Sequence, residues 1–254
     1  MGEETRRTAL VTGGARGIGR AICEQLAEAD LDVVVADLRF EEAQETASAL
    51  EAKGVSAWAV ALDVVDPDGV KAVVEGATEK FGGVDVLVNN AGWDDLKLFI
   101  DGDEELWRRV VDINYLGPLR VTHAALPGMI ERRWGRVINI GSDAGRVGSS
   151  MESVYSGAKG GVIAFTKTLA REVARYAITA NTVCPGPTDT PFMRETVAEQ
   201  GDADTVIGSM VRAVPLRRLA LPAEVASAVA FFAREENGYI TGQTLSVSGG
   251  LTMA

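Results

Sequence analysis

Histidine and cysteine are both scarce in this chain of 254 residues, which has one histidine, His123, and two cysteines, Cys23 and Cys184. A single histidine excludes histidine-based metal sites and a serine–histidine triad, so we expect no bound metal. The cysteines lie far apart, each in an apolar stretch. We therefore expect two buried free thiols in a reducing compartment rather than a disulfide.

Long apolar runs are missing as well. No stretch of 18 apolar residues occurs, which excludes a membrane span, and the start MGEETRRTAL has no signal-peptide core. Excess positive charge is also lacking, because 25 Lys and Arg stand against 36 Asp and Glu, a net charge of −11. Such a surface repels phosphate backbones. We expect a cytoplasmic protein with no nucleic-acid or membrane partner.

Short apolar runs alternate with longer segments of helical period. This alternation predicts right-handed crossovers and a parallel sheet that is covered on both faces. No Pro-, Gly- or Ser-rich linker divides the chain. We therefore predict an α/β fold with residues 1–254 in a single doubly wound Rossmann domain of seven parallel strands. The predicted strands are Thr8–Val11, Asp32–Ala36, Ser56–Leu62, Val84–Val88, Val137–Ile140, Thr179–Cys184 and Thr244–Val247.

Two segments between the strands are unusual in length or composition. Glu104–Arg133 has a helical pattern in which Pro118 and Pro127 are expected to mark bends or ends. The segment from Pro185 to Pro215 is rich in proline and glycine and breaks the alternation. We expect residues 186–215 to form a lid over a binding site.

Glycine is abundant, at 28 residues, and several glycines follow the first strand in TGGARGIGR. Gly13 is expected to allow a tight turn, Gly17 to let the backbone approach a pyrophosphate, and Gly19 to let a helix pack closely on the sheet. The helix that begins here offers free N–H groups to phosphates. The turn therefore predicts dinucleotide binding, with Arg16 and Ile18 at the same site.

The second strand ends in Asp37, 18 residues after Gly19 and directly before Leu38. A carboxylate at this point accepts hydrogen bonds from the adenosine ribose and repels a 2′-phosphate, which favours NAD over NADP. Arg16 and Arg39 argue the other way, because either guanidinium neutralises a 2′-phosphate. We expect NAD.

A candidate catalytic group lies after the fifth strand. Tyr155 and Lys159 are four residues apart on one helical face, and Ser142 directly follows the strand. A nearby ammonium and the positive charge of an oxidised nicotinamide favour the phenolate of a tyrosine whose pKa is otherwise near 10. Ser142 is expected to hold the reacting oxygen while Tyr155 exchanges its proton.

At this point the chain resembles the short-chain dehydrogenase/reductase family. The matching motifs are TGGARGIG, NNAG, Asn114 in DINYLG, Ser142, Tyr155 with Lys159, and PGPTDT. The resemblance implies that Asn114 completes a catalytic tetrad by holding a water in a proton relay to Lys159. It also implies cofactor contacts from Asp63, Val64, Asn90, Ala91, Gly92, Tyr155, Lys159, Pro185, Gly186, Thr188 and Thr190.

The substrate wall is expected from three stretches, which contribute Trp93, Asp94, Asp143, Arg146, Val147, Ser149, Phe192 and Met193. Within the family, NNAGWD, SDAGRVGSSMESVYSGAKGG and LSVSGGLTMA are similar to the 2-hydroxycyclohexanecarboxyl-CoA dehydrogenase branch. This resemblance implies NAD-linked oxidation of a 2-hydroxy alicyclic acyl-CoA to the 2-keto thioester. Arg146, Arg194 and Arg212 are candidates to meet CoA phosphates, although each alone is more typical of an ordinary surface arginine.

Three alternatives remain open. They are a 3-oxoacyl-thioester reductase, a dehydrogenase of free cyclic or secondary alcohols, and an inactive NAD-binding regulatory protein. The family resemblance also implies a homotetramer. Val162, Ile163, Phe165 and Leu169 provide weak support for assembly, because they are more apolar positions than one buried helix face needs, but they could equally belong to the core.

Overall fold

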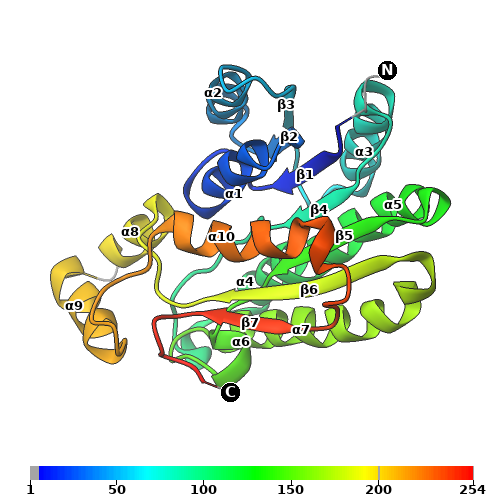
Figure 1. Cartoon of the computed structure of the whole chain (residues 1–254). Coiled ribbons are helices and arrows are strands. Elements are labelled where there is room, and N and C mark those ends of the chain that lie inside the picture. Colours follow the sequence, from blue (N-terminus) through cyan, green and yellow to red (C-terminus); the bar gives the residue numbers. More distant parts are fainter. Residues whose placement is uncertain (1–5, 200, 254) are drawn as a thin grey trace.

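A single sheet of seven parallel strands runs through the protein in the order β3-β2-β1-β4-β5-β6-β7, as seen in Figure 1. The coordinates come from a computed structural model that describes residues 6–199 and 201–253. The strand order reverses between β1 and β4, the point at which doubly wound sheets bind ligands. The strands are β1 Thr8–Thr12, β2 Asp32–Asp37, β3 Ala57–Ala61, β4 Val86–Asn89, β5 Gly135–Ile140, β6 Ile178–Pro185 and β7 Thr244–Val247.

Helices cover both faces of this sheet. One apolar core lies beneath α1 Gly17–Glu28, α2 Phe40–Glu51 and α10 Pro222–Ala233. The other core lies beneath α3 Pro67–Phe81, α5 Gly117–Arg132 and α7 Ser153–Val173. The predicted fold, a single doubly wound domain with seven parallel strands, is therefore confirmed.

The strands are buried because the sheet is sandwiched. All residues of β1, β4 and β5 are buried, which is why these strands show no apolar–polar alternation; they are mostly apolar, with Asn89, Arg136 and Asn139 as buried polar residues. Cys23 and Cys184 are buried free thiols, as predicted. Their place is in the packed interior, away from any disulfide partner.

The helical region at 104–133 is three elements rather than one. It consists of α4 Glu104–Val111, a π-helical turn Asp112–Leu116 and α5, in which Gly117 N–H donates to the carbonyl of Asp112 five residues earlier. Pro118 lies at the start of α5, as expected of a helix-starting proline. Pro127 was predicted to mark a bend or an end, but α5 continues through it to Arg132.

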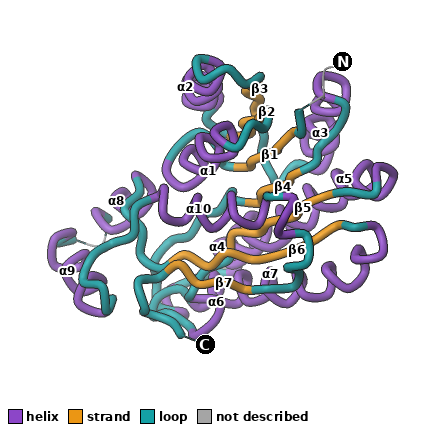
Figure 2. Tube along the Cα trace, in the orientation of Figure 1, coloured by secondary structure: helices purple, strands orange, loops and turns teal. Residues whose placement is uncertain are grey.

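The proline- and glycine-rich segment contains two helices that the sequence pattern did not indicate, α8 Pro191–Ala198 and α9 Ala203–Ala213. Figure 2 shows them joined by loops at one end of the sheet, after β6 and before α10. A short helix, α6 Ala144–Val147, follows β5 and packs against α7. These elements all follow the carboxyl ends of strands.

Of the two interpretations left open for the apolar residues of α7, subunit contact or core, the structure supports the core. Val162, Ile163 and Leu169 are buried within the single chain, and Phe165 packs against the core beneath α7. These four apolar residues are accounted for by the interior of one chain, so they give no indication of a helix face left for another subunit.

Candidate active site

The glycine-rich turn after β1 is compact because two glycines approach backbone atoms closely. Gly13 has φ of +64°, and a Cβ added to it would lie 2.9 Å from the Cα of Ala91. A Cβ on Gly19 would lie 1.9 Å from the carbonyl oxygen of Gly13. The same Cβ would lie 2.6 Å from the side-chain amide of Asn90, so Gly19 lets α1 approach the residues that follow β1 and β4.

The start of α1 suits an anion. Arg16 is the N-cap residue, and its side chain makes no capping hydrogen bond to the first-turn amides. Unsatisfied N–H groups and the positive end of the helix dipole then face the turn. The geometry of this cradle fits the pyrophosphate of a dinucleotide.

Asn90 ties this turn to the end of β4. Its side-chain amide donates to the carbonyls of Thr12 and Gly13, at 3.0 and 2.9 Å, and the hydroxyl oxygen of Thr12 accepts from the N–H groups of Asn90 and Ala91. The NNAG motif therefore fixes the glycine turn against the neighbouring strand. Asn89 is buried deeper, where it donates to Asn139 and Thr122.

Asp37 lies at the carboxyl end of β2 and holds the same region from the other side. One carboxylate oxygen accepts from the N–H of Ala15 at 3.0 Å, and the other accepts from the N–H of Arg39 at 2.9 Å. Two backbone donors orient the carboxylate at the point where a ribose is expected in this fold. Asp63 is organised in a similar way, since it accepts from the N–H of Val65 at 2.9 Å.

Both arginines near Asp37 already have acidic partners. Arg16 donates to both carboxylate oxygens of Glu195, and Arg39 donates to Glu42 at 3.3 Å. The hydrogen bond with Glu195 is the largest cause of a raised pKa of Arg16. Each guanidinium therefore already has a carboxylate partner.

A cavity of about 920 Å³ runs from the glycine turn to α7 and the segment after β6. It is large enough for a dinucleotide and part of a substrate. The cavity brings together every residue predicted for the cofactor: Gly13, Arg16, Gly17, Ile18, Gly19, Asp37, Leu38, Asp63, Val64, Asn90, Ala91, Gly92, Tyr155, Lys159, Pro185, Gly186, Thr188 and Thr190.

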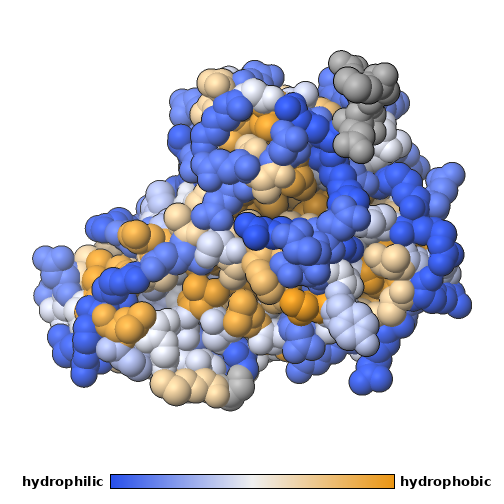
Figure 3. All heavy atoms as spheres, viewed as in Figure 1, coloured by the Kyte–Doolittle hydropathy of each residue, from blue (hydrophilic) through white to orange (hydrophobic). Residues whose placement is uncertain are grey.

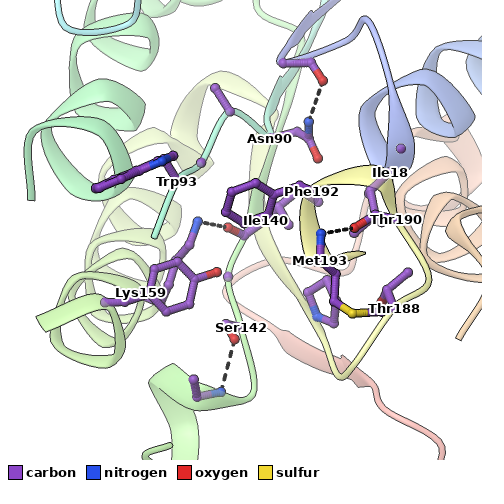
Figure 4. Close-up of a pocket in the computed structure, with 18 of the residues that line it drawn as sticks. Ile18, Asn90, Trp93, Ile140, Ser142, Lys159, Thr188, Thr190, Phe192 and Met193 are labelled. Atoms are coloured by element: carbon purple, nitrogen blue, oxygen red, sulfur yellow. Dashed lines mark hydrogen bonds between the residues drawn. The ribbon is translucent and has the colours of Figure 1, made fainter. Parts of the chain in front are cut away.

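Ser142, Tyr155 and Lys159 meet at one end of this cavity. The ammonium of Lys159 donates to the carbonyl of Ile140 at 2.9 Å and lies 5.6 Å from the ring centre of Tyr155 (Figure 4). Ser142 accepts from the N–H of Ala144 at 3.1 Å and is hydrogen-bonded to Tyr155. The predicted serine, tyrosine and lysine are therefore neighbours in space.

Burial dominates the electrostatics of these groups. It raises the pKa of the Tyr155 phenol, with further increases from Glu152 and Asp94, while the hydrogen bond to Ser142 lowers it. Burial lowers the pKa of Lys159 to about 8. In the protein by itself the surroundings thus hold Tyr155 as a neutral phenol, opposite to the lowered pKa expected from the sequence with an oxidised nicotinamide beside it.

Five predicted residues do not line the cavity, namely Asp94, Asn114, Arg146, Arg194 and Arg212. Asn114 is fully buried in the π-helical turn, where its amide donates to the carbonyls of Trp93 and Val110, at 2.5 and 2.9 Å. Arg146 is directed away and donates to the hydroxyl of Ser246 at 2.5 Å. The side chain of Asn114 thus fixes the backbone beside the site, and Arg146 does not contribute to the substrate wall.

The other predicted substrate residues, Trp93, Asp143, Val147, Ser149, Phe192 and Met193, do line the cavity. Asp143 is buried and accepts from Ser246, so its carboxylate also has a structural partner. Figure 4 shows Phe192 and Met193 on the segment after β6, across the cavity from Ser142 and Lys159.

The segment after β6 is held by its threonines. Thr190 caps α8 by accepting from the N–H of Met193 at 3.1 Å, and Thr188 donates to the carbonyl of Gly186 at 2.9 Å. Both threonines are buried and line the cavity. Arg194 forms a two-point pair with Asp189, and Arg212 donates to Ser209, so both candidate CoA-binding arginines have partners within the chain.

Sequence reasoning missed two charged residues at the substrate end, Arg109 and Glu152, whereas it had expected Asp94 on the substrate wall. Arg109 lines the cavity with its guanidinium 3.9 Å from the ring centre of Trp93, and Glu152 lines it three residues before Tyr155. Asp94 is buried nearby and acts electrostatically on both Tyr155 and Lys159. The position of Glu152, one helical turn before Tyr155, was a usable signal, whereas the Arg109–Trp93 contact depends on the tertiary fold.

No helix within residues 6–199 and 201–253 is long and apolar enough to cross a membrane. Within the same residues, no group of three or more histidine, cysteine, aspartate or glutamate side chains is arranged to hold a metal ion.

Comparison with known proteins gives a consistent set of relatives. The family model for short chain dehydrogenase matches residues 7–201. The 3-oxoacyl-[acyl-carrier-protein] reductase FabG of Vibrio cholerae is 42% identical over 97% of this chain and 98% of its own length. The oxidoreductase UcpA of Escherichia coli K12 is 38% identical over 100% of this chain and 97% of its own.

The solved structures agree with these relatives. A variant of actinorhodin polyketide ketoreductase, crystallised with NADPH, is 37% identical, has a TM-score of 0.92, and is matched over 99% of both chains. The names of the matched reductases differ from the 2-hydroxycyclohexanecarboxyl-CoA dehydrogenase branch that the sequence motifs suggested. They correspond to the first alternative left open there.

Proposed function

Because the chain belongs to the short chain dehydrogenase family and is an NAD(P)-dependent oxidoreductase of alcohols and ketones, we propose that it acts on the carbonyl carbon β to a thioester. The observation that carries this proposal is the meeting of Ser142, Tyr155 and Lys159 at one end of a cavity whose other end is the glycine turn. The proposed reaction interconverts a 3-oxoacyl and a 3-hydroxyacyl thioester.

This reaction covers both functions that the sequence suggested for a thioester substrate, the alicyclic acyl-CoA dehydrogenase and the 3-oxoacyl-thioester reductase. In a 2-hydroxycyclohexanecarboxyl thioester, the ring carbon with the hydroxyl is the carbon β to the thioester carbonyl. The alicyclic compound is therefore a 3-hydroxyacyl thioester whose α and β carbons share a ring. One catalytic arrangement serves both, and only the wall of the substrate pocket distinguishes a linear chain from a ring.

The proposed roles of the three side chains follow from their contacts. The hydroxyl of Ser142, already hydrogen-bonded to Tyr155, orients the substrate oxygen. Tyr155 donates its proton to the oxygen of a ketone, or accepts the proton of an alcohol. Lys159 keeps a positive charge near the phenol, from its anchor on the Ile140 carbonyl. The nicotinamide, when bound, supplies or takes the hydride.

The proposed tetrad member Asn114 acts by position. Its side chain is occupied by the carbonyls of Trp93 and Val110, and its Oδ1 is 3.0 Å from where a Cβ on Gly92 would lie. Gly92 in turn approaches the Lys159 ammonium. We infer that Asn114 holds the backbone around Lys159, the point at which the resemblance implies a water-mediated relay.

We propose NAD(H) as the preferred cofactor. Asp37 is fixed by two backbone donors, and the only guanidiniums beside it in the described chain are those of Arg16 and Arg39, each paired with a glutamate. A 2′-phosphate would meet the carboxylates of Asp37, Glu42 and Glu195 against two cations. This charge balance supports NAD(H), although the ketoreductase of similar structure was crystallised with NADPH.

The substrate end combines aromatic rings and one cation. Trp93 and Phe192 line the cavity, and Arg109 stacks on Trp93. Aromatic walls suit a compact ring or a short acyl group, and an arginine without a carboxylate partner among the described residues suits the phosphate of a thioester carrier. We propose an acyl group carried by CoA or by another phosphopantetheine thiol, with residues 186–215 closing over it as a lid.

The test is a panel of oxidation and reduction rates with NAD(H) and NADP(H). The substrates are linear 3-hydroxyacyl-CoA with its ketone, 2-hydroxycyclohexanecarboxyl-CoA with its ketone, the N-acetylcysteamine thioesters of both, and free cyclohexanol. The proposal expects both thioester classes to exceed the free alcohol by orders of magnitude in kcat/KM. Equal or better turnover of the free alcohol would contradict it.

A tyrosine variant separates an enzyme from a cofactor-binding regulator. Tyr155→Phe is expected to keep cofactor binding and to lose turnover by a factor of about 10³ or more, because the proton donor is gone. Tyr239→Phe makes the same chemical change on a fully exposed side chain and should leave turnover unchanged. A wild-type protein that binds cofactor without any turnover in the panel would favour the regulatory alternative.

We further infer a homotetramer, on different grounds from those the sequence offered. Strand β7 is the edge of the sheet, and Leu245 on it is exposed together with Phe231 of α10 and the nearby Tyr239. Apolar residues gather over this part of the surface in Figure 3. Light scattering after size-exclusion chromatography tests the assembly, and a monomer at micromolar concentration would refute it.

A further inference from the structure

A second, much smaller cavity lies behind the catalytic tyrosine. It has a volume of about 20 Å³, room for one water, and lies between the loop after β4, α4 and the start of α7. Tyr155 and Glu152 line both this cavity and the large one, so they form the wall between the two. Asp94 lines the small cavity but not the large one.

Asp94 is an unusual aspartate. Its residue is only 9% exposed, and its Oδ2 is buried without any hydrogen-bond partner. A buried carboxylate oxygen with no donor strongly disfavours the ionised form. In agreement, burial raises the pKa of Asp94 to about 7, although a hydrogen bond from the backbone N–H of Asp95 lowers it; the charges of Glu152 and Asp95 add smaller increases and Lys159 a decrease.

Glu152 is the second carboxyl group in this place. It precedes α7 as the N-cap residue and makes no capping hydrogen bond, so its side chain is not engaged in holding the helix. Burial raises its pKa as well, while a hydrogen bond from Ser149 lowers it. Two acidic side chains thus face the tyrosine from two different elements.

Several titratable or charged groups surround Tyr155, and two of them, Arg109 of α4 and Asp143 after β5, line the large cavity with it. Glu152 and Asp94 act on it from α7's start and from the loop after β4, and Cys184 acts from β6. Lys159 lies on the same helix, and the residues of α4 that line the small cavity, Leu106, Trp107 and Val110, carry no charge. Asp95 is turned to Lys97 in an ion pair of 2.6 Å and is not among the groups that act on Tyr155.

We propose that Asp94 and Glu152 are positioning carboxyl groups whose charge state sets the pH at which Tyr155 exchanges its proton with the alcohol or ketone. When the two are protonated, the phenol has only the Lys159 ammonium near it and loses its proton more easily. When they are ionised, their negative charge opposes the phenolate. This inference rests on the proposed role of Tyr155.

The decisive experiment is the pH dependence of alcohol oxidation in Asp94→Asn and Glu152→Gln. Oxidation requires the phenolate, so its rate rises with pH to a plateau. Each substitution removes a negative charge, and the midpoint of this rise should move to lower pH, by about one unit. Asp95→Asn removes the neighbouring charge that faces Lys97 and should leave the midpoint unchanged.

A midpoint that stays at the wild-type pH in both Asp94→Asn and Glu152→Gln would overturn the inference, as would an equal shift in Asp95→Asn. Should Asp94→Asn not fold, the pH profile of Glu152→Gln decides alone. The proposed function fails separately, because in that case Tyr155→Phe retains turnover. Loss of activity in Tyr155→Phe with unmoved midpoints in the carboxyl variants overturns only the present inference.

Discussion

The guanidinium of Arg16 and the carboxylate of Glu195 form a two-point ion pair, at 2.5 and 2.8 Å, that joins the glycine-rich turn to α8. Glu195 belongs to the segment after β6, and Arg16 belongs to the glycine-rich turn that lines the cofactor cavity. The pair therefore does two things at once. It occupies one of the two arginines beside Asp37, and it anchors one helix of the proposed lid.

Glu195→Gln is the first prediction. The amide cannot hold Arg16 as an ion pair, so the guanidinium becomes able to meet a 2′-phosphate. We expect kcat/KM with NADP(H) to rise several-fold, up to about tenfold, with little change for NAD(H). Glu24→Gln, which removes the partner of Arg20 on the exposed side of α1, is the control. An unchanged cofactor ratio would show that Arg16 does not face the 2′ position.

Asp37→Asn is the second prediction, and it concerns the carboxylate itself. The substitution keeps the shape but removes the charged acceptor that two backbone N–H groups orient. Hydrogen bonds to a charged group contribute about 1.5–3 kcal/mol, so KM for NAD(H) should increase by about 10- to 100-fold. Asp32→Asn is the control. Asp32 lies at the other end of β2, where its carboxylate accepts from the N–H of Ser56, and its substitution should leave KM for NAD(H) unchanged.

The sequence was sufficient for the parts of the site that depend on position along the chain. Parallel strands bring their carboxyl ends to one edge, so residues that directly follow strands, such as Gly13, Asp37 and Ser142, had to meet there. The helical period was enough to put Tyr155 and Lys159 on one face. Gly13, Gly17, Gly19 and Asp37, expected from their positions, line the large cavity, and so do the residues that only the family resemblance implied, such as Asp63 and Thr188.

The parts that depend on packing between distant segments were not predictable. Nothing local distinguishes Arg146, which meets Ser246 across the fold, from Arg109, which stacks on Trp93 in the cavity. The burial of Asp94 likewise depends on how its loop meets α4 and α7. Side-chain direction in such segments is set by tertiary contacts, which a single sequence does not encode as a visible pattern.

Gly19→Ala is the third prediction. The new Cβ would lie 1.9 Å from the carbonyl oxygen of Gly13, so the turn must open. We expect loss of cofactor binding and a destabilisation of about 2 kcal/mol or more. Gly157→Ala is the matched control, because a Cβ there meets nothing within 4 Å. It lies in the interior of α7, where alanine should stabilise by about 0.5–1 kcal/mol.

The result is read by fluorescence titration with NADH and by thermal unfolding of both alanine variants. Normal cofactor affinity in Gly19→Ala would mean that the turn adapts, and the close approach of α1 to the turn would then not be essential. A loss of cofactor binding in Gly157→Ala would show that the effect is not specific to the cradle.

The fourth prediction concerns the stability cost of the catalytic lysine. Burial lowers the pKa of Lys159 from 10.5 to about 8, so between these pH values the unfolded chain binds more protons than the folded one. Stability therefore rises with pH across this window, and below about pH 8 the full penalty of the buried ammonium is present. The penalty for burying the ammonium is on the order of 3 kcal/mol. Replacing the lysine removes this penalty but also loses the hydrogen bond to the Ile140 carbonyl, which contributes about 1 kcal/mol.

Lys159→Met should therefore be inactive yet more stable than the wild type at pH 7, by about 1–2 kcal/mol, and this advantage should shrink as the pH approaches 10. Urea unfolding of both proteins at several pH values measures the difference. Lys167→Met alters an exposed lysine of the same helix and should show neither the gain nor its pH dependence. If Lys159→Met is less stable at every pH by a constant amount, the lysine stabilises the fold, and its charge carries no buried cost.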